Sequence, residues 1–418
     1  MIRLRPVLQG GGAVIALAVP SALAAQDVEV RVSAEAGVES NPYLVTDGLD
    51  SQDDGLTAMA GIAIEPSVYF TDERSTLSLN SSFRLREYAG SERSNESAYV
   101  NASGTNRINE RTSLTASASF GTSRSAVQDI FRAGTPDLLD PVEGVDPEFP
   151  EFDPTLAGLD RRTYNYGARA SLTRQLTERD AISLGVDASQ TTIDGDIGND
   201  YRRAGAIVNY ARKLTERTSL QSSVTIAKND LLGQSFGDGV SVTPLIGVAQ
   251  QINEQLSWSA SGGITYTEID DGRGGNFTNT DWAGSFQLCR RAEQSALCAN
   301  AARDARATTF GGLTTSTSAS LAYNFMPSQV DRIKLGASYR RSKRILSNEV
   351  IDEFGNGVVF PDDTFEFWGV NAGYSRNLTD RLYAFSDVSY TDAIGGTTTR
   401  DGNFRAAIGL TYRFGGRR

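Results

Sequence analysis

The most constraining feature of the sequence is an alternation of apolar and polar residues with a period of two. In the segment 75–89, apolar residues stand at Leu77, Leu79, Phe83 and Leu85, and polar residues fill most positions between them. Other segments, including 218–230, 256–269 and 402–414, alternate in the same way. Successive side chains of a β-strand point to opposite faces, so this pattern predicts a series of strands with one apolar and one polar face.

The composition favours a hollow protein over one with a large apolar core. Hydrophobic residues make up 39% of the 418 residues, which is below the usual share for a soluble protein of this length. Serine and threonine are frequent on the polar faces of the expected strands. Polar faces of this uniformity indicate that water covers that side of each strand.

The residue types and the net charge exclude several classes of function. The chain has no histidine, which removes imidazole acid–base chemistry, catalytic triads that contain histidine and histidine metal sites. The formal net charge of -11 argues against a nucleic-acid partner, because phosphates require a basic surface. We therefore expect a protein without enzymatic activity, cofactor or resident metal.

Residues 1–25 have the pattern of a cleaved signal peptide. Arg3 and Arg5 precede a short apolar run, and Ala22-Leu23-Ala24 at its end matches the small-x-small motif that signal peptidase accepts. The run is too short for a membrane-spanning helix, which needs roughly 20 apolar residues. The expected mature protein is a single domain that comprises residues 26–418.

Short polar connections, which are typical of tight hairpin turns, recur between the expected strands. These connections are Thr71-Asp72-Glu73-Arg74, Asn109-Glu110-Arg111, Leu176-Thr177-Glu178-Arg179, Leu214-Thr215-Glu216-Arg217, Ile252-Asn253-Glu254-Gln255 and Leu378-Thr379-Asp380-Arg381. Longer connections alternate with them. An antiparallel meander with an apolar outside, a polar inside, short turns at one end and long loops at the other is typical of a transmembrane β-barrel. Closure of the barrel leaves no unpaired strand edge in the lipid.

This pattern predicts an all-β, up-and-down barrel of about sixteen strands, with fourteen or eighteen strands as alternatives. The expected strands are 28–40, 56–70, 75–89, 96–107, 112–124, 161–174, 181–193, 200–213, 218–230, 240–251, 256–269, 307–324, 331–345, 364–376, 381–393 and 402–414. The segment from Thr280 to Arg290 also looks like a strand, but counting it would place the turn near Asn377 on the wrong side of the membrane. We therefore expect residues 270–306 to form one long external loop.

The two cysteines of the chain, Cys289 and Cys298, both fall within this expected loop. Their close spacing, together with export through the inner membrane, favours a disulfide that forms in an oxidising compartment. A metal site would need further ligands nearby.

A barrel of this width encloses an aqueous channel, and charged residues from two regions are candidates for its lining. The loop 125–160 contributes the acidic candidates, which are Asp137, Asp140, Glu143, Asp146, Glu148, Glu151 and Asp153. The strands contribute the inward-facing arginines, which are Arg84, Arg86, Arg169 and Arg405. If the loop folds into the lumen, its carboxylates and these arginines form a constriction that selects ions. The alternatives are a solvated surface loop, and arginines that pair with wall acids such as Asp187.

The ends of the chain carry resemblances to known outer-membrane proteins. The last strand, with Tyr412 and the aromatic Phe414, resembles the C-terminal signal that the barrel-assembly machinery recognises, although Gly415 to Arg418 follow it. The segments 36–43, 64–68 and 74–79 resemble a family of β-barrel porins linked to bacterial exopolysaccharide production. Pro147-Glu148-Phe149 lies in the third long loop, the loop that folds inward in the diffusion porins of Gram-negative bacteria.

These resemblances imply a channel of the bacterial outer membrane, surrounded by lipid and lipopolysaccharide, that serves exopolysaccharide export or the passive passage of polar solutes. A general diffusion porin with an inward acidic third loop is one alternative. A non-conducting structural or adhesin barrel is another. The sequence leaves the transported solute or polymer and the oligomeric state open.

Overall fold

A computed structural model of the chain describes residues 26–42, 55–89, 94–124, 161–195, 200–232, 238–270, 275–308, 312–344, 350–351, 357–358, 364–395 and 402–415. The expected signal peptide and the loop 125–160 lie outside these residues.

Every regular element in the described ranges is a β-strand. The strands are β1 (Gln26–Glu39), β2 (Thr57–Thr71), β3 (Ser75–Tyr88), β4 (Ser94–Asn109), β5 (Thr112–Ser123), β6 (Thr163–Gln175), β7 (Asp180–Ile193), β8 (Asp200–Lys213), β9 (Thr218–Leu232), β10 (Gly239–Gln251), β11 (Leu256–Asp270), β12 (Asn276–Ala292), β13 (Ser295–Thr308), β14 (Gly312–Phe325), β15 (Asp331–Arg344), β16 (Val350–Ile351), β17 (Gly357–Val358), β18 (Thr364–Asn377), β19 (Leu382–Gly395) and β20 (Asn403–Gly415). Across the same ranges, no helix is long and apolar enough to cross a membrane.

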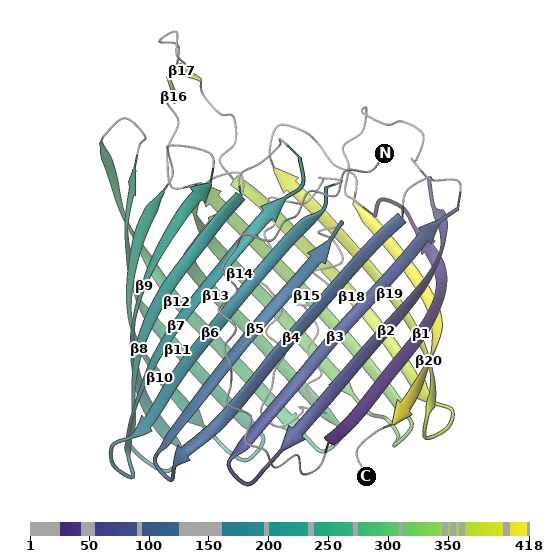
Figure 1. Cartoon of the computed structure of the whole chain (residues 1–418), viewed down its shortest axis with the longest axis horizontal. Coiled ribbons are helices and arrows are strands. Elements are labelled where there is room, and N and C mark those ends of the chain that lie inside the picture. The colour runs from purple at the N-terminus through teal and green to yellow at the C-terminus, as the bar shows by residue number, and fades with distance from the viewer. Residues whose placement is uncertain are drawn as a thin grey trace.

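The long strands form one closed antiparallel barrel (Figure 1). In the described part of the chain, 18 strands belong to this sheet, while β16 and β17 pair only with each other. Each long strand pairs with the next along the chain, and β1 pairs with β20 from Glu29↔Gly415 to Glu39↔Arg405. This last pairing joins the two ends of the meander, so the first and last strands gain partners on both sides.

The prediction of about sixteen strands is wrong. The described residues contribute 18 strands to the barrel, and the two that were not predicted, β12 and β13, occupy the segment 270–306 that was assigned to an external loop. Adding one strand would have reversed all later turns, but adding two preserves their orientation. The sequence of β13 does not indicate a strand, because it is rich in alanine and charged residues, which have low β-propensity.

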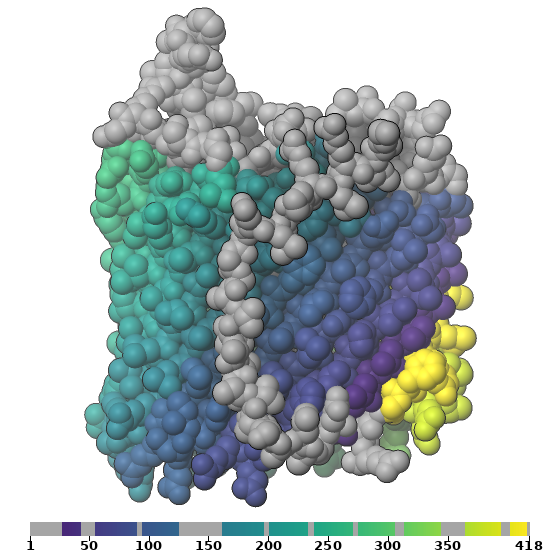
Figure 2. All heavy atoms as spheres, viewed as in Figure 1, coloured from purple at the N-terminus to yellow at the C-terminus, as the bar shows by residue number. Residues whose placement is uncertain are grey.

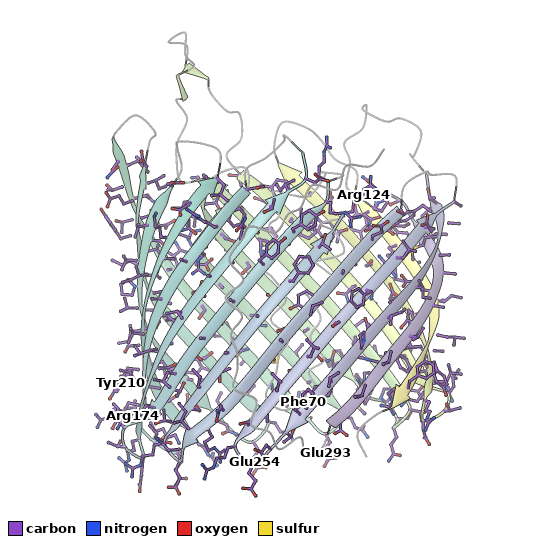
Figure 3. All side chains as sticks on the ribbon, viewed as in Figure 1. Phe70, Arg124, Arg174, Tyr210, Glu254 and Glu293 are labelled. Atoms are coloured by element: carbon purple, nitrogen blue, oxygen red, sulfur yellow. A yellow bond between two sulfur atoms is a disulfide. The ribbon has the colours of Figure 1, made fainter. Side chains whose placement is uncertain are left out.

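The two cysteines therefore lie in the barrel wall and not in an external loop. Cys289 of β12 stands opposite Cys298 of β13 in the sheet register, and the structure joins them by a disulfide. The turn between these strands contains Glu293, which lies at the same end of the barrel as Glu254 in the turn after β10 (Figure 3). The disulfide thus ties two neighbouring strands together near the short-turn end.

The outward face of the barrel is apolar and exposed. Large side chains with exposed fractions of about one half or more alternate along the strands, and they include Leu184, Val186, Ile246, Ile264 and Ile408. In the coloured parts of the face shown in Figure 2, the strands lie against one another without a visible gap. A soluble protein rarely exposes such a large apolar surface, whereas lipid covers it at no cost. The outer face therefore defines a membrane-spanning barrel.

The short turns are stabilised by their own side chains. The Thr177 hydroxyl accepts hydrogen bonds from the backbone N–H groups of Arg179 and Asp180 and donates to the Asp180 carboxylate. Thr379 accepts from the backbone in the equivalent turn between β18 and β19. Such side-chain to backbone bonds favour turns over regular structure. The hairpin turns predicted from the repeated motif at these positions are present in the structure.

The position of the β12–β13 turn can be tested by labelling engineered thiols in intact cells. In a background in which both cysteines are replaced by serine, we expect Glu293→Cys and Glu254→Cys to resist a membrane-impermeant thiol reagent, because both lie at the short-turn end. Arg124→Cys, at the opposite end, should react. Labelling of both Glu293→Cys and Arg124→Cys would contradict this position and would instead place the β12–β13 turn on the outside of the cell.

Candidate channel lining

The inner face of the barrel is built from small polar side chains that bond across strands. The hydroxyls of Ser78 and Ser103 lie 2.8 Å apart, and those of Thr243 and Thr265 lie 2.9 Å apart. The Ser33 hydroxyl of β1 lies 2.8 Å from that of Thr411 of β20, at the closure of the barrel. Side chains of this size leave space inside a wide barrel, and their hydroxyls can bond both to each other and to water.

A buried ion cluster lies on the inner face where the barrel closes. The Arg86 Nε donates a hydrogen bond of 2.6 Å to Glu35 Oε1, and Arg405 Nη2 donates one of 2.9 Å to Glu35 Oε2. Arg405 also forms an ion pair with Asp387. The side chains of Arg86, Glu35 and Arg405 are only 4%, 10% and 10% exposed. Glu35 therefore joins β1 to strands on both sides of it.

A second carboxylate extends this network. Glu39 is buried, and it accepts hydrogen bonds of 2.9 Å from the Tyr88 hydroxyl and from the Asn403 side-chain amide. Arg84 lies 3.7 Å from Glu65 in a more exposed ion pair. Three of the predicted inward arginines, Arg84, Arg86 and Arg405, thus lie beside wall acids. This arrangement agrees with the expected pairing of inward arginines with wall acids, and their role at a constriction stays a prediction.

Arg169 lies away from this cluster. It stands opposite Asp187 in the pairing of β6 with β7, and Asp187 forms an ion pair with Arg203 of β8. Alternation also places Arg203 on the inner face, although this residue is not among the predicted site residues. The pairing of β7 with β8 could have identified it. Arg203 stands opposite Ser189, and Asp187 lies two positions before Ser189 on the same face of β7, within reach of the arginine.

The acidic candidates Asp137, Asp140, Glu143, Asp146, Glu148, Glu151 and Asp153 lie outside the described residues. The aromatic residues of the expected assembly signal lie in β20, with the rings of Tyr412 and Phe414 4.6 Å apart on the outer face. Their recognition by the assembly machinery stays a prediction. In the described part of the chain, no group of three or more cysteines, aspartates and glutamates could hold a metal ion.

The apolar outer face and the polar, charge-paired inner face define a transmembrane β-barrel. Solved structures with a similar course of the chain include the FrpB iron transporter from Neisseria meningitidis, with a TM-score of 0.46 and 10% sequence identity over 94% of this chain and 83% of that chain. They also include Pseudomonas aeruginosa OprD, with a TM-score of 0.42 and 10% identity over 93% of this chain and 95% of that chain.

A further similar structure is Pseudomonas aeruginosa OccK2 in complex with glucuronate, with a TM-score of 0.42 and 10% identity over 93% of this chain and 98% of that chain. No protein-family model matches the sequence, and no curated protein matches it. The resemblance to porins linked to exopolysaccharide production therefore stays a prediction.

The buried cluster should contribute strongly to stability. Replacing Glu35 by glutamine removes the charge that both guanidinium groups share, and breaking a buried ion pair in this way costs about 3 to 5 kcal/mol. The temperature of the gel-mobility shift on heating in detergent should fall accordingly. Glu29→Gln is the matched control, because Glu29 forms a more exposed pair with Arg31 that is worth about 1 kcal/mol or less. Equal effects of the two substitutions would contradict the role of the cluster.

Proposed function

We propose that the chain forms a water-filled channel in the bacterial outer membrane and lets polar solutes pass down a concentration gradient. The observation that carries this proposal is the contrast between the two faces of one closed sheet. Exposed apolar residues cover the outside, and hydroxyl groups and paired charges cover the inside. An inner face of this kind would be a poor core for a solid protein, but it is a suitable wall for water.

The width of the barrel supports passage. Barrels of about eight strands are filled by their own side chains, whereas barrels of sixteen to eighteen strands leave an aqueous lumen. The 18 strands found in the described residues belong to the second group. The signal peptide expected in residues 1–25 and the assembly signal expected at Tyr412 and Phe414 support delivery to the outer membrane.

The inner wall fits uncharged or weakly charged polar solutes, including sugars. Arg86, Arg405 and Arg203 are each bonded to a carboxylate, so these three guanidinium groups carry little free attraction for anions. Hydroxyl groups along the wall can replace part of the hydration of a sugar. This chemistry, together with the sequence resemblance, extends the proposal to a growing exopolysaccharide as a second candidate cargo.

The proposal predicts steady ion conductance. Purified protein in a planar lipid bilayer should give stepwise current increases at constant voltage, and liposomes that contain it should swell in small sugars faster than in large ones. A folded, heat-modifiable barrel that gives no current would instead be a structural or adhesin barrel. Loss of surface polysaccharide on deletion of the gene, with sugar uptake unchanged, would favour export over general diffusion.

The ion preference of this current reports where the acidic loop lies. Replacing Asp140, Glu143, Asp146 and Glu148 by their amides should reduce cation preference if the loop lines the pore, because charged walls set the selectivity of a pore. The measurement is the reversal potential in a salt gradient. Glu110→Gln and Glu216→Gln, in short turns, are controls that remove charge elsewhere. Identical reversal potentials for all variants would assign the loop to the cell surface.

A further inference from the structure

The barrel wall is interrupted between β12 and β13. Their pairing runs from Ala292↔Ser295 to Gly284↔Arg303 and ends there within the described residues, although β12 reaches back to Asn276 and β13 continues to Thr308. β12 stays paired with β11 as far as Asn276, and β13 stays paired with β14 as far as Thr308. We call the resulting gap between residues 276–283 of β12 and residues 304–308 of β13 the seam.

We call the described ends of β13 and β14, residues 304–308 and 312–315, the hairpin end, and it lies inside the barrel rather than in its wall. Leu313 is on the same face of β14 as the exposed, outward-facing Leu321, but Leu313 itself is fully buried. A Cβ atom added to Gly239, at the start of β10, would lie 2.7 Å from Leu313 Cδ1. Parts of β13 also come within 8 Å of β8, which is not its neighbour in the sheet. The hairpin end therefore lies behind the wall, against its inner face.

The seam extends into the lipid-facing part of the barrel. Trp282 on β12 is 62% exposed and stands opposite Ile264, which is 51% exposed. The next outward pair, Tyr266 and Thr280, lies further toward the long-loop end. The unpaired edge of β12 thus begins at the level of the apolar band. A strand edge that faces hydrocarbon leaves backbone groups unsatisfied, at a cost of several kcal/mol for each group.

A small polar cluster crosses the seam at this level. Asp281 Oδ2 accepts a hydrogen bond of 2.6 Å from Arg303 Nη2 and one of 3.2 Å from the Thr315 hydroxyl. Arg303 Nη1 donates one of 2.9 Å to the Thr317 hydroxyl. The Arg303 guanidinium also lies over the Trp282 ring, 4.7 Å from its centre. We call Asp281, Arg303 and Thr315 the latch, because their bonds hold β12 against β13 and β14 beside the missing backbone pairing. Thr317 stands opposite Arg303 in the pairing of β13 with β14 and orients its guanidinium.

We propose that the seam is a lateral exit through which an anionic amphiphile passes between the lumen and the surrounding lipid, and that the latch closes it. This goes beyond the passage of polar solutes along the barrel axis. The exit connects a polar lumen to the apolar band. Only a solute with both polar and apolar parts makes favourable contacts at both ends of this path. Arg303 supplies a cation for an acidic head group, which takes the place of Asp281 when the latch opens.

The apolar part of the solute also finds a matching surface. Ile269 lies on the inner face of β11 and is fully buried, like Leu313. Movement of the hairpin end away from the wall, into the lumen, would expose this apolar area next to the opened seam. Trp282 continues the path on the lipid side. A carboxylic acid with an alkyl chain fits these contacts, because its carboxylate can pair with Arg303 and its chain can pack against the apolar residues.

Crosslinking the latch tests this proposal. In the variant Asp281→Cys/Thr315→Cys, a bifunctional methanethiosulfonate should bridge β12 to β14, because the two native side chains lie in hydrogen-bond contact. The native cysteines are joined to each other and do not react. The matched control is Ser33→Cys/Thr411→Cys, a contact of 2.8 Å in the continuous part of the wall. The heat-induced gel shift verifies that each variant is folded.

The readout is uptake of dansyl-undecanoate by Gram-negative cells that carry each variant, with a small sugar measured in parallel. Without crosslinking, we expect both variants to take up the fatty acid faster than cells without the barrel. Crosslinking should reduce uptake to the level of those cells in the seam variant only, and sugar entry should stay unchanged. Fatty-acid uptake that crosslinking leaves unchanged, or that never exceeds the level of cells without the barrel, would overturn the lateral exit. Failure of sugar entry in all variants would contradict the axial channel instead, because the fatty acid reports on the seam alone.

Discussion

Lipid offers no hydrogen-bond partners to a peptide group, and this constraint governs the architecture of the whole chain. Each long strand must pair on both sides, and the sheet meets this demand by closing on itself between β1 and β20. Closure brings the two ends of the sequence together, as in the contact between Ser33 and Thr411. It also forces every side chain to face either lipid or lumen, so the apolar and polar alternation of the sequence becomes an outside and an inside.

The parts of the fold that could be predicted are those that depend on neighbouring residues. The face that each side chain occupies follows from the period of two, and Ile264, Arg86 and Arg405 lie where this period places them. The turns are local as well, since Thr177 and Thr379 bond to backbone groups two and three residues further on. Sixteen of the strands were predicted near their observed positions for the same reason.

The parts that could not be predicted depend on partners distant in sequence. Arg86 and Arg405 were expected inside, but their shared contact with Glu35 exists only because closure sets β20 beside β1 in one particular register. The number of strands is a global property too, because an even number satisfies closure whether it is sixteen or eighteen. Arg303 made β13 harder to identify, since the alternation of its strand places a charge on the lipid side. The structure explains this residue by its contacts with Asp281 and Trp282.

The seam is an interruption of the backbone pairing within the described strands. Its unpaired backbone groups cost free energy that a fully paired wall would not lose. Continuing the pairing of β12 with β13 past Gly284 would satisfy the backbone and would require no side-chain cluster. The chain instead places Leu313 behind the wall and bridges the gap from Asp281 to Arg303 and to the Thr315 hydroxyl. Separating β12 from the hairpin end requires breaking only these few side-chain bonds, whereas separating two strands paired along their length requires breaking a backbone hydrogen bond at almost every residue. A wall held by side chains at one place and by backbone elsewhere is therefore weakest at that place, which is where a lateral opening requires the least energy.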